Sequence, residues 1–212
     1  MRYADHRREY TQGGLRREML AEGPMALLTR WLDEAVAAGL SDPTAASLAT
    51  IEPAGDPWQR VVLIKEVGAD GLVFYTNYQS HKARDLAHCN RACLLFPWQE
   101  LERQVTVQGR VVEVDAARSD QYFASRPRTS QLGAWASQQS EAINDRETLE
   151  AQYRTIEKQF AGQDITRPPH WGGFLLQPQR IEFWQGGALR MHDRFRCERD
   201  ADANWQITRL QP

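Results

Sequence analysis

Four clusters of basic and hydroxyl-bearing side chains are the parts of this sequence that could do chemistry, and all four suit anion binding. In the first cluster, Arg60 and Lys65 flank the apolar run 61–64. Because side chains alternate along a strand, these two cations are expected on opposite faces unless a bulge intervenes, so they would serve different ligands or different halves of one site. Taken alone, the segment is better explained by ordinary charges at strand ends.

The second cluster, Ser80-His81-Lys82, stands where a strand-like segment gives way to a helix-like one. A helix start offers free backbone N–H groups and the positive end of the helix dipole. A hydroxyl and a lysine at that position predict a phosphate cradle. A plain serine cap with a surface lysine explains the segment at least as well.

The third cluster lies at the end of a predicted helix. Tyr122 and Arg126 are four residues apart and so share a helix face, Pro127 ends the helix, and Ser130 follows. A phenol, a guanidinium and a hydroxyl would then converge on one anion, and the planar arginine fork suits phosphate. A solvated helix end is an equally good alternative.

The fourth cluster is a run of alternating cationic or titratable residues near the C-terminus. Arg190, His192 and Arg194 would face one side of an extended strand, and Gly186-Gly187 predicts a hairpin turn before it. Three such groups on one face indicate an anion or cofactor opposite them. The alternative is an exposed polar edge with Asp193 as counter-charge.

Short strands are the elements expected to position these clusters. Helices are predicted near 24–39, 80–88, 116–125 and 145–160, the last with an Asn144–Glu147 capping box. Hairpin-length connections between many short strands favour an antiparallel barrel, and no Gly-x-Gly-x-x-Gly follows a strand. The predicted strands are 44–51, 59–66, 71–76, 92–96, 104–114, 173–177, 180–184, 195–199 and 205–209.

Composition narrows the class of protein. The 212 residues suit one domain, here 23–212, preceded by an arm over 1–22 that is expected to be mobile. A net charge of −2 gives no global field that would attract nucleic acid or an anionic membrane. No apolar run long enough for a membrane span or a signal peptide is present, so a cytoplasmic protein is expected. Three cysteines and five histidines show no metal-ligand spacing, and no metal site is predicted.

Taken together, the clusters and the segments around them resemble the pyridoxine/pyridoxamine 5′-phosphate oxidase family. The resemblance runs nearly from end to end, and the order and spacing of the segments make it specific. The segments that carry it are RREY (7–10), GGL (13–15), QRVVLIK (59–65), FYTN (74–77), LLFPW (94–98), LERQV (101–105), SRPR (125–128), QLGAW (131–135), WGGF (171–174), IEFWQGG (181–187) and RMHDRF (190–195).

The resemblance implies a mainly β fold with peripheral helices, an antiparallel Greek-key split β-barrel of the FMN-binding type. It also implies a homodimer with FMN at the subunit interface, part of each site coming from the second subunit. Family members often have Arg where this chain has His81, which is charged only part of the time near neutral pH. By position, the FMN-binding residues would be Arg60, Val61, Val62, Leu63, Lys65, Tyr75, Thr76, His81, Lys82, Gln104, Gln139, Ser140, Trp184 and Arg194.

The implied substrate is pyridoxine or pyridoxamine 5′-phosphate, oxidised to pyridoxal 5′-phosphate while O2 becomes H2O2. Arg190 and His192 would act beside the reacting carbon, under a lid formed by Arg7 and Tyr10. The substrate phosphate would be held by Lys65, Tyr122, Arg126 and Ser130. Three alternatives remain open: a flavin reductase of the same fold using a nicotinamide, a non-catalytic carrier of flavin or pyridoxal 5′-phosphate, and a nucleic-acid binder.

Overall fold

The computed structural model describes residues 8–12 and 14–212. The strands are β1 (Ala45–Ile51), β2 (Pro57–Gly68), β3 (Gly71–Asn77), β4 (Arg91–Trp98), β5 (Arg103–Glu113), β6 (Trp171–Gln185), β7 (Asp193–Arg199) and β8 (Trp205–Leu210). The α-helices are α1 (Pro24–Ala37), α2 (His81–His88), α3 (Ala116–Ser125), α4 (Arg128–Ala136) and α5 (Arg146–Gln159). Three short 3-10 turns are η1 (Arg17–Leu20), η2 (Gln99–Leu101) and η3 (Ala188–Arg190).

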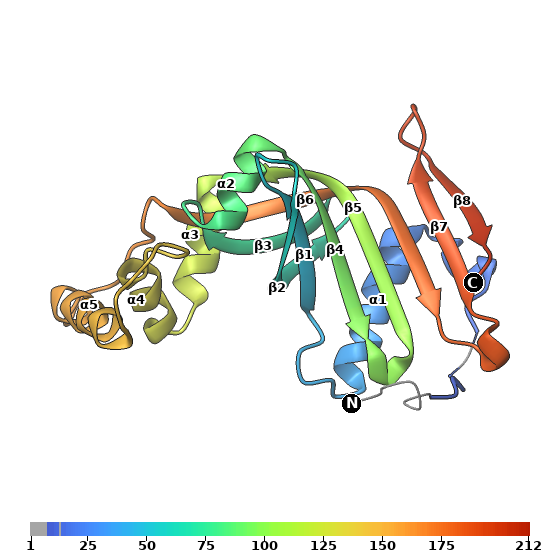
Figure 1. The fold of residues 1–212 in the computed structure, drawn as a ribbon, viewed down its shortest axis with the longest axis horizontal. Coiled ribbons are helices and arrows are strands. Elements are labelled where there is room, and N and C mark those ends of the chain that lie inside the picture. The colour runs from blue at the N-terminus through green and yellow to red at the C-terminus, as the bar shows by residue number, and fades with distance from the viewer. Residues whose placement is uncertain (1–7, 13) are drawn as a thin grey trace.

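Six strands close into an antiparallel barrel, and two more extend it (Figure 1). The strand order is β3-β2-β1-β4-β5-β6-β7-β8, and an additional β3–β6 pairing closes the ring. Strands β1, β2 and β3 are neighbours in sequence order, and β4 returns to pair with β1 on its other side. This order is that of a Greek key. The predicted antiparallel split β-barrel is therefore confirmed.

Strand β6 makes both the barrel and its extension possible. Its first half pairs with β3 and its second half with β7, while β5 lies along its whole length. The prediction of two separate strands at 173–177 and 180–184 was wrong, because β6 runs through Pro178 and a register shift opposite Gln108/Gly109 leaves Gln179 without a partner in β5.

The helices follow the predictions except around α4 and the start of α5. Helix α4 was not predicted, because Pro127 ends α3 and also serves as the N-cap of a new helix. The predicted Asn144–Glu147 capping box was wrong. Asp145 is the N-cap instead, and its carboxylate accepts a hydrogen bond from the Thr148 N–H.

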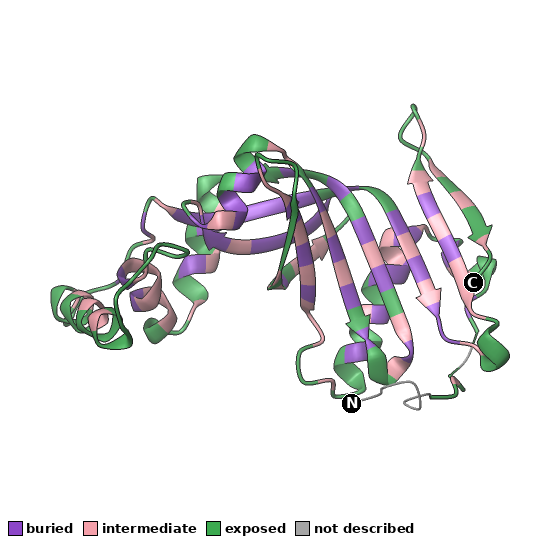
Figure 2. Ribbon diagram, viewed as in Figure 1, coloured by how far each residue is buried: buried purple, intermediate pink, exposed green. Residues whose placement is uncertain are grey.

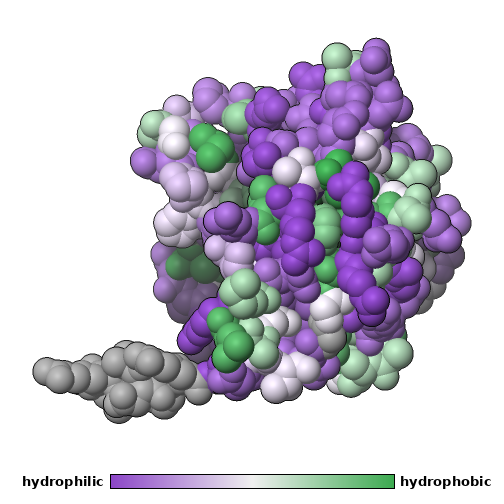
Figure 3. All heavy atoms as spheres, turned by 90° about the vertical axis from the view of Figure 1, so that its right-hand side faces the viewer, coloured by the Kyte–Doolittle hydropathy of each residue, from purple (hydrophilic) through white to green (hydrophobic). Residues whose placement is uncertain are grey.

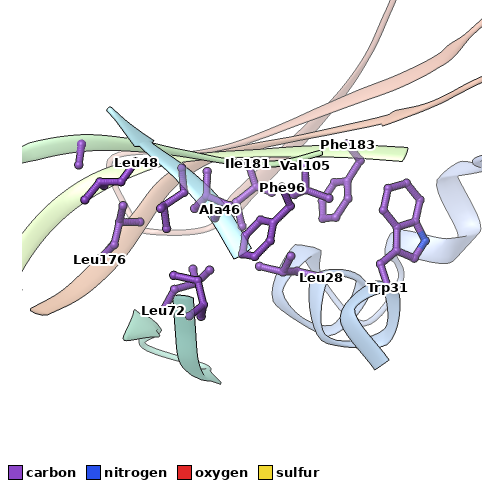
Figure 4. Packing of buried hydrophobic residues seen from close by; sticks show 14 of the residues in the cluster. Leu28, Trp31, Ala46, Leu48, Leu72, Phe96, Val105, Leu176, Ile181 and Phe183 are labelled. Carbon is purple, nitrogen blue, oxygen red and sulfur yellow. The ribbon is translucent and has the colours of Figure 1, made fainter. Parts of the chain in front are cut away.

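The main core fills the barrel and continues under α1. Inward and outward residues alternate along the strands, as the purple and green bands of β4 and β5 show (Figure 2). Trp31 of α1 meets Phe183 of β6 edge to face, with ring centroids 5.4 Å apart, and Leu28 lies near Phe96 (Figure 4). A second, smaller cluster of Phe123, Leu132, Ile165 and Trp171 packs α3 and α4 against the start of β6.

The side of the molecule that carries β7 and β8 is largely hydrophilic, with apolar side chains interleaved between long polar ones (Figure 3). Within the described part of the chain, no helix combines the length and apolar character that a membrane crossing requires.

Candidate functional site

A polar pocket of about 340 Å³ opens between β2, β3 and α3. It brings together residues from three of the four clusters found in the sequence, namely Lys65, Lys82, and Tyr122 with Arg126. All but one of the residues that line it were predicted as site residues, the exception being Trp171. The lining is Val61, Val62, Leu63, Lys65, Tyr75, Thr76, Lys82, Tyr122, Arg126, Gln139 and Trp171.

Lys82 is a buried cation that suits an anionic ligand. Its ammonium donates to the hydroxyls of Thr76 (3.2 Å) and Ser80 (3.5 Å), and no described carboxylate lies within ion-pair distance of it. Burial, assisted by the positive charge of Arg60, lowers the pKa of Lys82 to about 8. A buried ammonium held only by hydroxyls is stabilised by any anion that enters. The ammonium and hydroxyls on which the predicted phosphate cradle depends therefore lie together at the start of α2, although Ser80 makes no side-chain cap.

Arg60 lies behind this cradle and does not line the pocket. Its guanidinium donates to the hydroxyl of Thr50 (2.5 Å) and pairs with Asp85 (3.3 Å), whose side chain is 1% exposed. His81 points toward carboxylates as well, with Nε2 2.8 Å from Glu52 and 3.4 Å from Asp85. Two acidic residues therefore accompany the cations of the cradle.

Arg60 and Lys65 lie on opposite faces of β2, as the alternation predicts. Val62 and Ile64 follow Arg60 inward, whereas Lys65 is exposed at the pocket. A register shift between Ile64 and Glu66 makes Lys65 a bulge residue. Because the bulge lies at the end of the alternating run 60–64, it leaves the alternation intact.

Arg126 carries an unpaired donor in the pocket. Its guanidinium lies 4.4 Å from the ring centre of Trp171 and 5.5 Å from that of Phe123. The Nη1 atom is buried and has no hydrogen-bond partner among the described residues, and burial lowers the pKa of Arg126. A buried guanidinium donor without an acceptor costs stability, so the Nη1 atom suits an anionic ligand.

A stack of parallel rings forms one wall of the pocket. Tyr75 lies 3.9 Å from Tyr122 and 5.5 Å from Trp171 between ring centroids. The Tyr75 hydroxyl donates to Glu66 (2.8 Å), which also accepts from Arg118 (2.7 Å). Burial and the Glu66 carboxylate raise the pKa of Tyr75, so it remains a neutral donor that Glu66 holds in place.

Three further predicted residues stand side by side on neighbouring strands. Gln104 of β5 is opposite Trp184 of β6, and Trp184 is opposite Arg194 of β7. Arg194 is bound to Glu182, with its Nη2 2.6 Å from the carboxylate. These residues belong to the β5-β6-β7 side of the chain and do not line the pocket between β2 and α3.

The expected strand carrying Arg190, His192 and Arg194 on one face was wrong. Arg190 ends the 3-10 turn η3 with φ +63°, and β7 begins only after His192. The hairpin predicted at Gly186-Gly187 is present, because β6 and β7 pair antiparallel on either side of it, but its connection spans residues 186–192 and is not a two-residue turn. The turn leaves Arg190 exposed, while His192 Nδ1 accepts a hydrogen bond from the Gly187 N–H (3.1 Å).

The described part of the N-terminal arm lies against this connection. The Tyr10 ring meets Trp184 and His192 edge to face, at 5.5 and 5.3 Å between centroids. A second pocket of about 410 Å³ lies between the arm and the connection, and Arg190 lines it. Arg7, the other predicted lid residue, lies outside the described residues.

The remaining predicted residues stand near the edges of the first pocket. Gln139 accepts from Thr76 (3.2 Å), whereas Ser140 is exposed and Ser130, in the first turn of α4, does not line the cavity. Trp171 and the carboxylates Glu66, Asp85 and Glu102 were not predicted as site residues. The role of an acidic residue depends on which cation lies opposite it in the fold. The sequence around these carboxylates therefore does not predict that they belong to the site.

Another cavity, of about 750 Å³, lies elsewhere and contains none of the predicted site residues. Its charged side chains already have partners, for example Arg180 with Glu198 (2.6 Å). The first pocket is therefore the better candidate site, because Nη1 of Arg126 is buried there without any hydrogen-bond partner among the described residues.

Two family models and several known proteins match this chain. Residues 32–160 match the family model described as pyridoxamine 5'-phosphate oxidase, and residues 171–212 match the pyridoxine 5'-phosphate oxidase C-terminal dimerisation region. A pyridoxine/pyridoxamine 5'-phosphate oxidase of Teredinibacter turnerae is 48% identical over all of both chains. Another, of Burkholderia lata, is 50% identical over 99% of this chain and 98% of its own.

Solved structures share the fold. PhzG from Burkholderia lata, in complex with tetrahydrophenazine-1-carboxylic acid, superimposes with a TM-score of 0.88 at 31% identity, covering 95% of this chain and all of its own. An FMN binding protein of Nostoc punctiforme gives 0.70 at 17% identity, covering 87% of this chain and 95% of its own, which shows the fold alone. From the full-length sequence matches and the shared barrel, the chain belongs to the pyridoxine/pyridoxamine 5′-phosphate oxidase family of enzymes.

Proposed function

We propose that this protein oxidises pyridoxine 5′-phosphate or pyridoxamine 5′-phosphate to pyridoxal 5′-phosphate with FMN and O2, in the cytoplasm. With the amine substrate, water and O2 are consumed, and ammonia and H2O2 are released. The observation that carries the proposal is the buried, unpartnered Nη1 of Arg126 beside Tyr122 and Lys65. This set of donors suits the phosphate of the substrate.

The cradle around Lys82 suits the phosphate of FMN. Lys82, the Thr76 hydroxyl and the N–H groups at the start of α2 would hold it, with Arg60 adding positive charge from behind. The exposed apolar side chains of Val61 and Leu63 offer a surface for the flavin ring. When bound, FMN supplies the acceptor for a hydride from the substrate carbon and the route for those electrons to O2.

A homodimer would complete the site. In one chain, Arg190, His192, Trp184 and Arg194 lie apart from the pocket that holds Lys82 and Arg126. We infer that the connection 186–192 of one subunit covers the pocket of the other, with Arg190 beside the reacting carbon, where it would stabilise developing negative charge. The match of residues 171–212 to a dimerisation region supports this arrangement.

Peroxide release with pyridoxamine 5′-phosphate tests the proposal. The purified protein should be yellow or become so with FMN, and should form one H2O2 and one pyridoxal 5′-phosphate per O2 consumed. A flavin-loaded protein that forms neither would contradict it, and would instead fit the carrier function. Oxidation of a nicotinamide without pyridoxal 5′-phosphate formation would indicate the flavin reductase.

The similarity to PhzG, solved with a tricyclic carboxylic acid, supports a second candidate function. A flavin-dependent oxidation of a reduced tricyclic carboxylate would use the same barrel. The cations of the first pocket would then meet a carboxylate instead of a phosphate. A competition assay distinguishes the two, because a phosphate-specific pocket is inhibited by pyridoxal 5′-phosphate and not by a tricyclic carboxylate.

A further inference from the structure

Glu102 is a buried carboxylate to which the proposed reaction assigns no role. It ends the turn η2 with φ +54°, and its side chain is 2% exposed. A charged side chain that forgoes water needs compensating contacts. Nearly all of those contacts come from residues about 90 positions away, in the N-terminal arm.

The arm binds the Glu102 carboxylate through its backbone. Oε2 accepts from the N–H groups of Thr11 and Gln12, both at 2.8 Å, and Oε1 accepts from Arg8 at 2.8 Å. The Arg8 side chain is 54% exposed, so its ion pair contributes little. The two backbone N–H groups converge on one carboxylate oxygen, which is a specific anchor for the chain at this point.

The same residue also holds the connection between β6 and β7. The Gly186 N–H donates to the Glu102 carbonyl oxygen (2.7 Å), and Gln185 Nε2 donates to it as well (3.2 Å). A Cβ at Gly186 would lie 2.7 Å from Tyr10 Cδ1 and 3.0 Å from Glu102 Cβ. The N-terminal arm, the turn η2 and the connection 186–192 are thus packed together at Glu102. Gln185, which donates to the Glu102 carbonyl oxygen, is the chain neighbour of Trp184.

We propose that Glu102 is a positioning residue for the active site. It fixes residues 8–12 against the connection 186–192, so that Tyr10 packs on His192 and Trp184 and keeps His192 in one orientation. Its carboxylate holds the arm while its carbonyl oxygen holds the connection, and the two are therefore placed by one residue. This inference depends on the proposed function in one respect, which is that Arg190 and His192 contact the substrate.

A double-mutant cycle between Glu102 and Tyr10 tests the coupling. Glu102→Ala and Tyr10→Ala should each lower kcat/KM for pyridoxamine 5′-phosphate by roughly tenfold, a loss equivalent to about one broken hydrogen-bonded contact. The double variant should be no worse than about twice either single variant, because both act through the same arm. Losses that multiply to about a hundredfold would overturn the inference.

Three further variants separate the arm contact from a general loss of stability. Glu102→Gln can still present an oxygen to the two N–H groups, so it should lose less than about threefold. Glu102→Asp keeps the charge and tolerates the left-handed backbone, but falls one methylene short and should follow Glu102→Ala. Glu34→Ala, which removes a surface carboxylate paired with Arg103, should behave as wild type. An equal loss in Glu102→Gln and Glu102→Ala would overturn the role of the N–H pair.

Limited trypsin digestion gives a readout that does not depend on catalysis. Cleavage after Arg8 should be about tenfold faster in Glu102→Ala and Glu102→Asp, because residues 8–12 are released more often. Cleavage should be unchanged in Glu34→Ala, and FMN affinity should stay within about twofold in all variants. Wild-type cleavage rates in Glu102→Ala would refute the anchor. If the protein oxidises no pyridoxamine 5′-phosphate but the arm is released as predicted, only the proposed function fails.

Discussion

The lowered pKa of Lys82 predicts that FMN binding weakens at alkaline pH. Burial lowers this pKa to about 8, so the free protein loses the charge of Lys82 just above neutrality. A bound phosphate dianion would restore the proton by raising the pKa again. Binding is therefore strongest below about pH 8, where Lys82 is already protonated, and falls as the pH rises beyond it.

The size of the effect follows from the titration of one group. With a pKa of about 8, roughly nine-tenths of Lys82 is charged at about pH 7 and one-tenth at about pH 9. The Kd for FMN should therefore rise about tenfold over that interval, provided that the pKa in the complex lies above the interval. Phosphate itself stays a dianion there, because its second pKa is near 6.

Quenching of flavin fluorescence in a titration measures this Kd. Riboflavin, which lacks the phosphate, serves as the control ligand and should show no comparable change. Lys82→Arg should flatten the FMN profile, because a guanidinium stays charged throughout. A Kd for FMN that is constant across the interval, or a riboflavin profile of the same slope, would refute the reasoning.

Three more predictions concern the same pockets. Arg126→Ala should cost about 2–3 kcal/mol of substrate binding, which is roughly a 30- to 150-fold rise in KM, with FMN content unchanged; an unaltered KM would contradict the assignment. His81→Arg should tighten FMN by about fivefold at mildly alkaline pH, because it places a permanent charge between Glu52 and Asp85, and equal flavin titrations would exclude the idea. At substrate concentrations well below KM, where the Arg126→Ala and Arg190→Ala homodimers are each nearly inactive, an equal mixture of the two subunits should recover about a quarter of wild-type activity, because half of the dimers are heterodimers and each has one intact site; no recovery would place both residues in the same subunit's site.

Much of the fold could be predicted from the sequence because its strands alternate and its turns are short. The predicted helix at 116–125 coincides with α3, and Pro24 begins α1 as expected. Prediction from local sequence patterns failed at two prolines. Pro127 ends one helix and also caps the next, and Pro178 lies in a register shift of β6 where a strand break was expected.

The candidate site could be predicted in part. The alternation of β2 placed Arg60 and Lys65 on opposite faces, and helical spacing placed Tyr122 and Arg126 together. Arg190 could not be placed by alternation, since a left-handed backbone ends the regular pattern before β7 begins. Glu102 is invisible to pattern analysis, because its partners are backbone N–H groups far away in the sequence.

The measurement that most directly tests the central claim compares pyridoxamine 5′-phosphate with pyridoxamine as substrates of the FMN-loaded enzyme. If Lys65, Tyr122 and Arg126 hold the substrate phosphate, two charge-assisted hydrogen bonds of about 1.5–3 kcal/mol each predict a kcat/KM at least about a hundredfold higher for the phosphate ester. Arg126→Ala should reduce that ratio to near ten or below. Equal kcat/KM values for the two substrates in the wild-type enzyme would contradict the account.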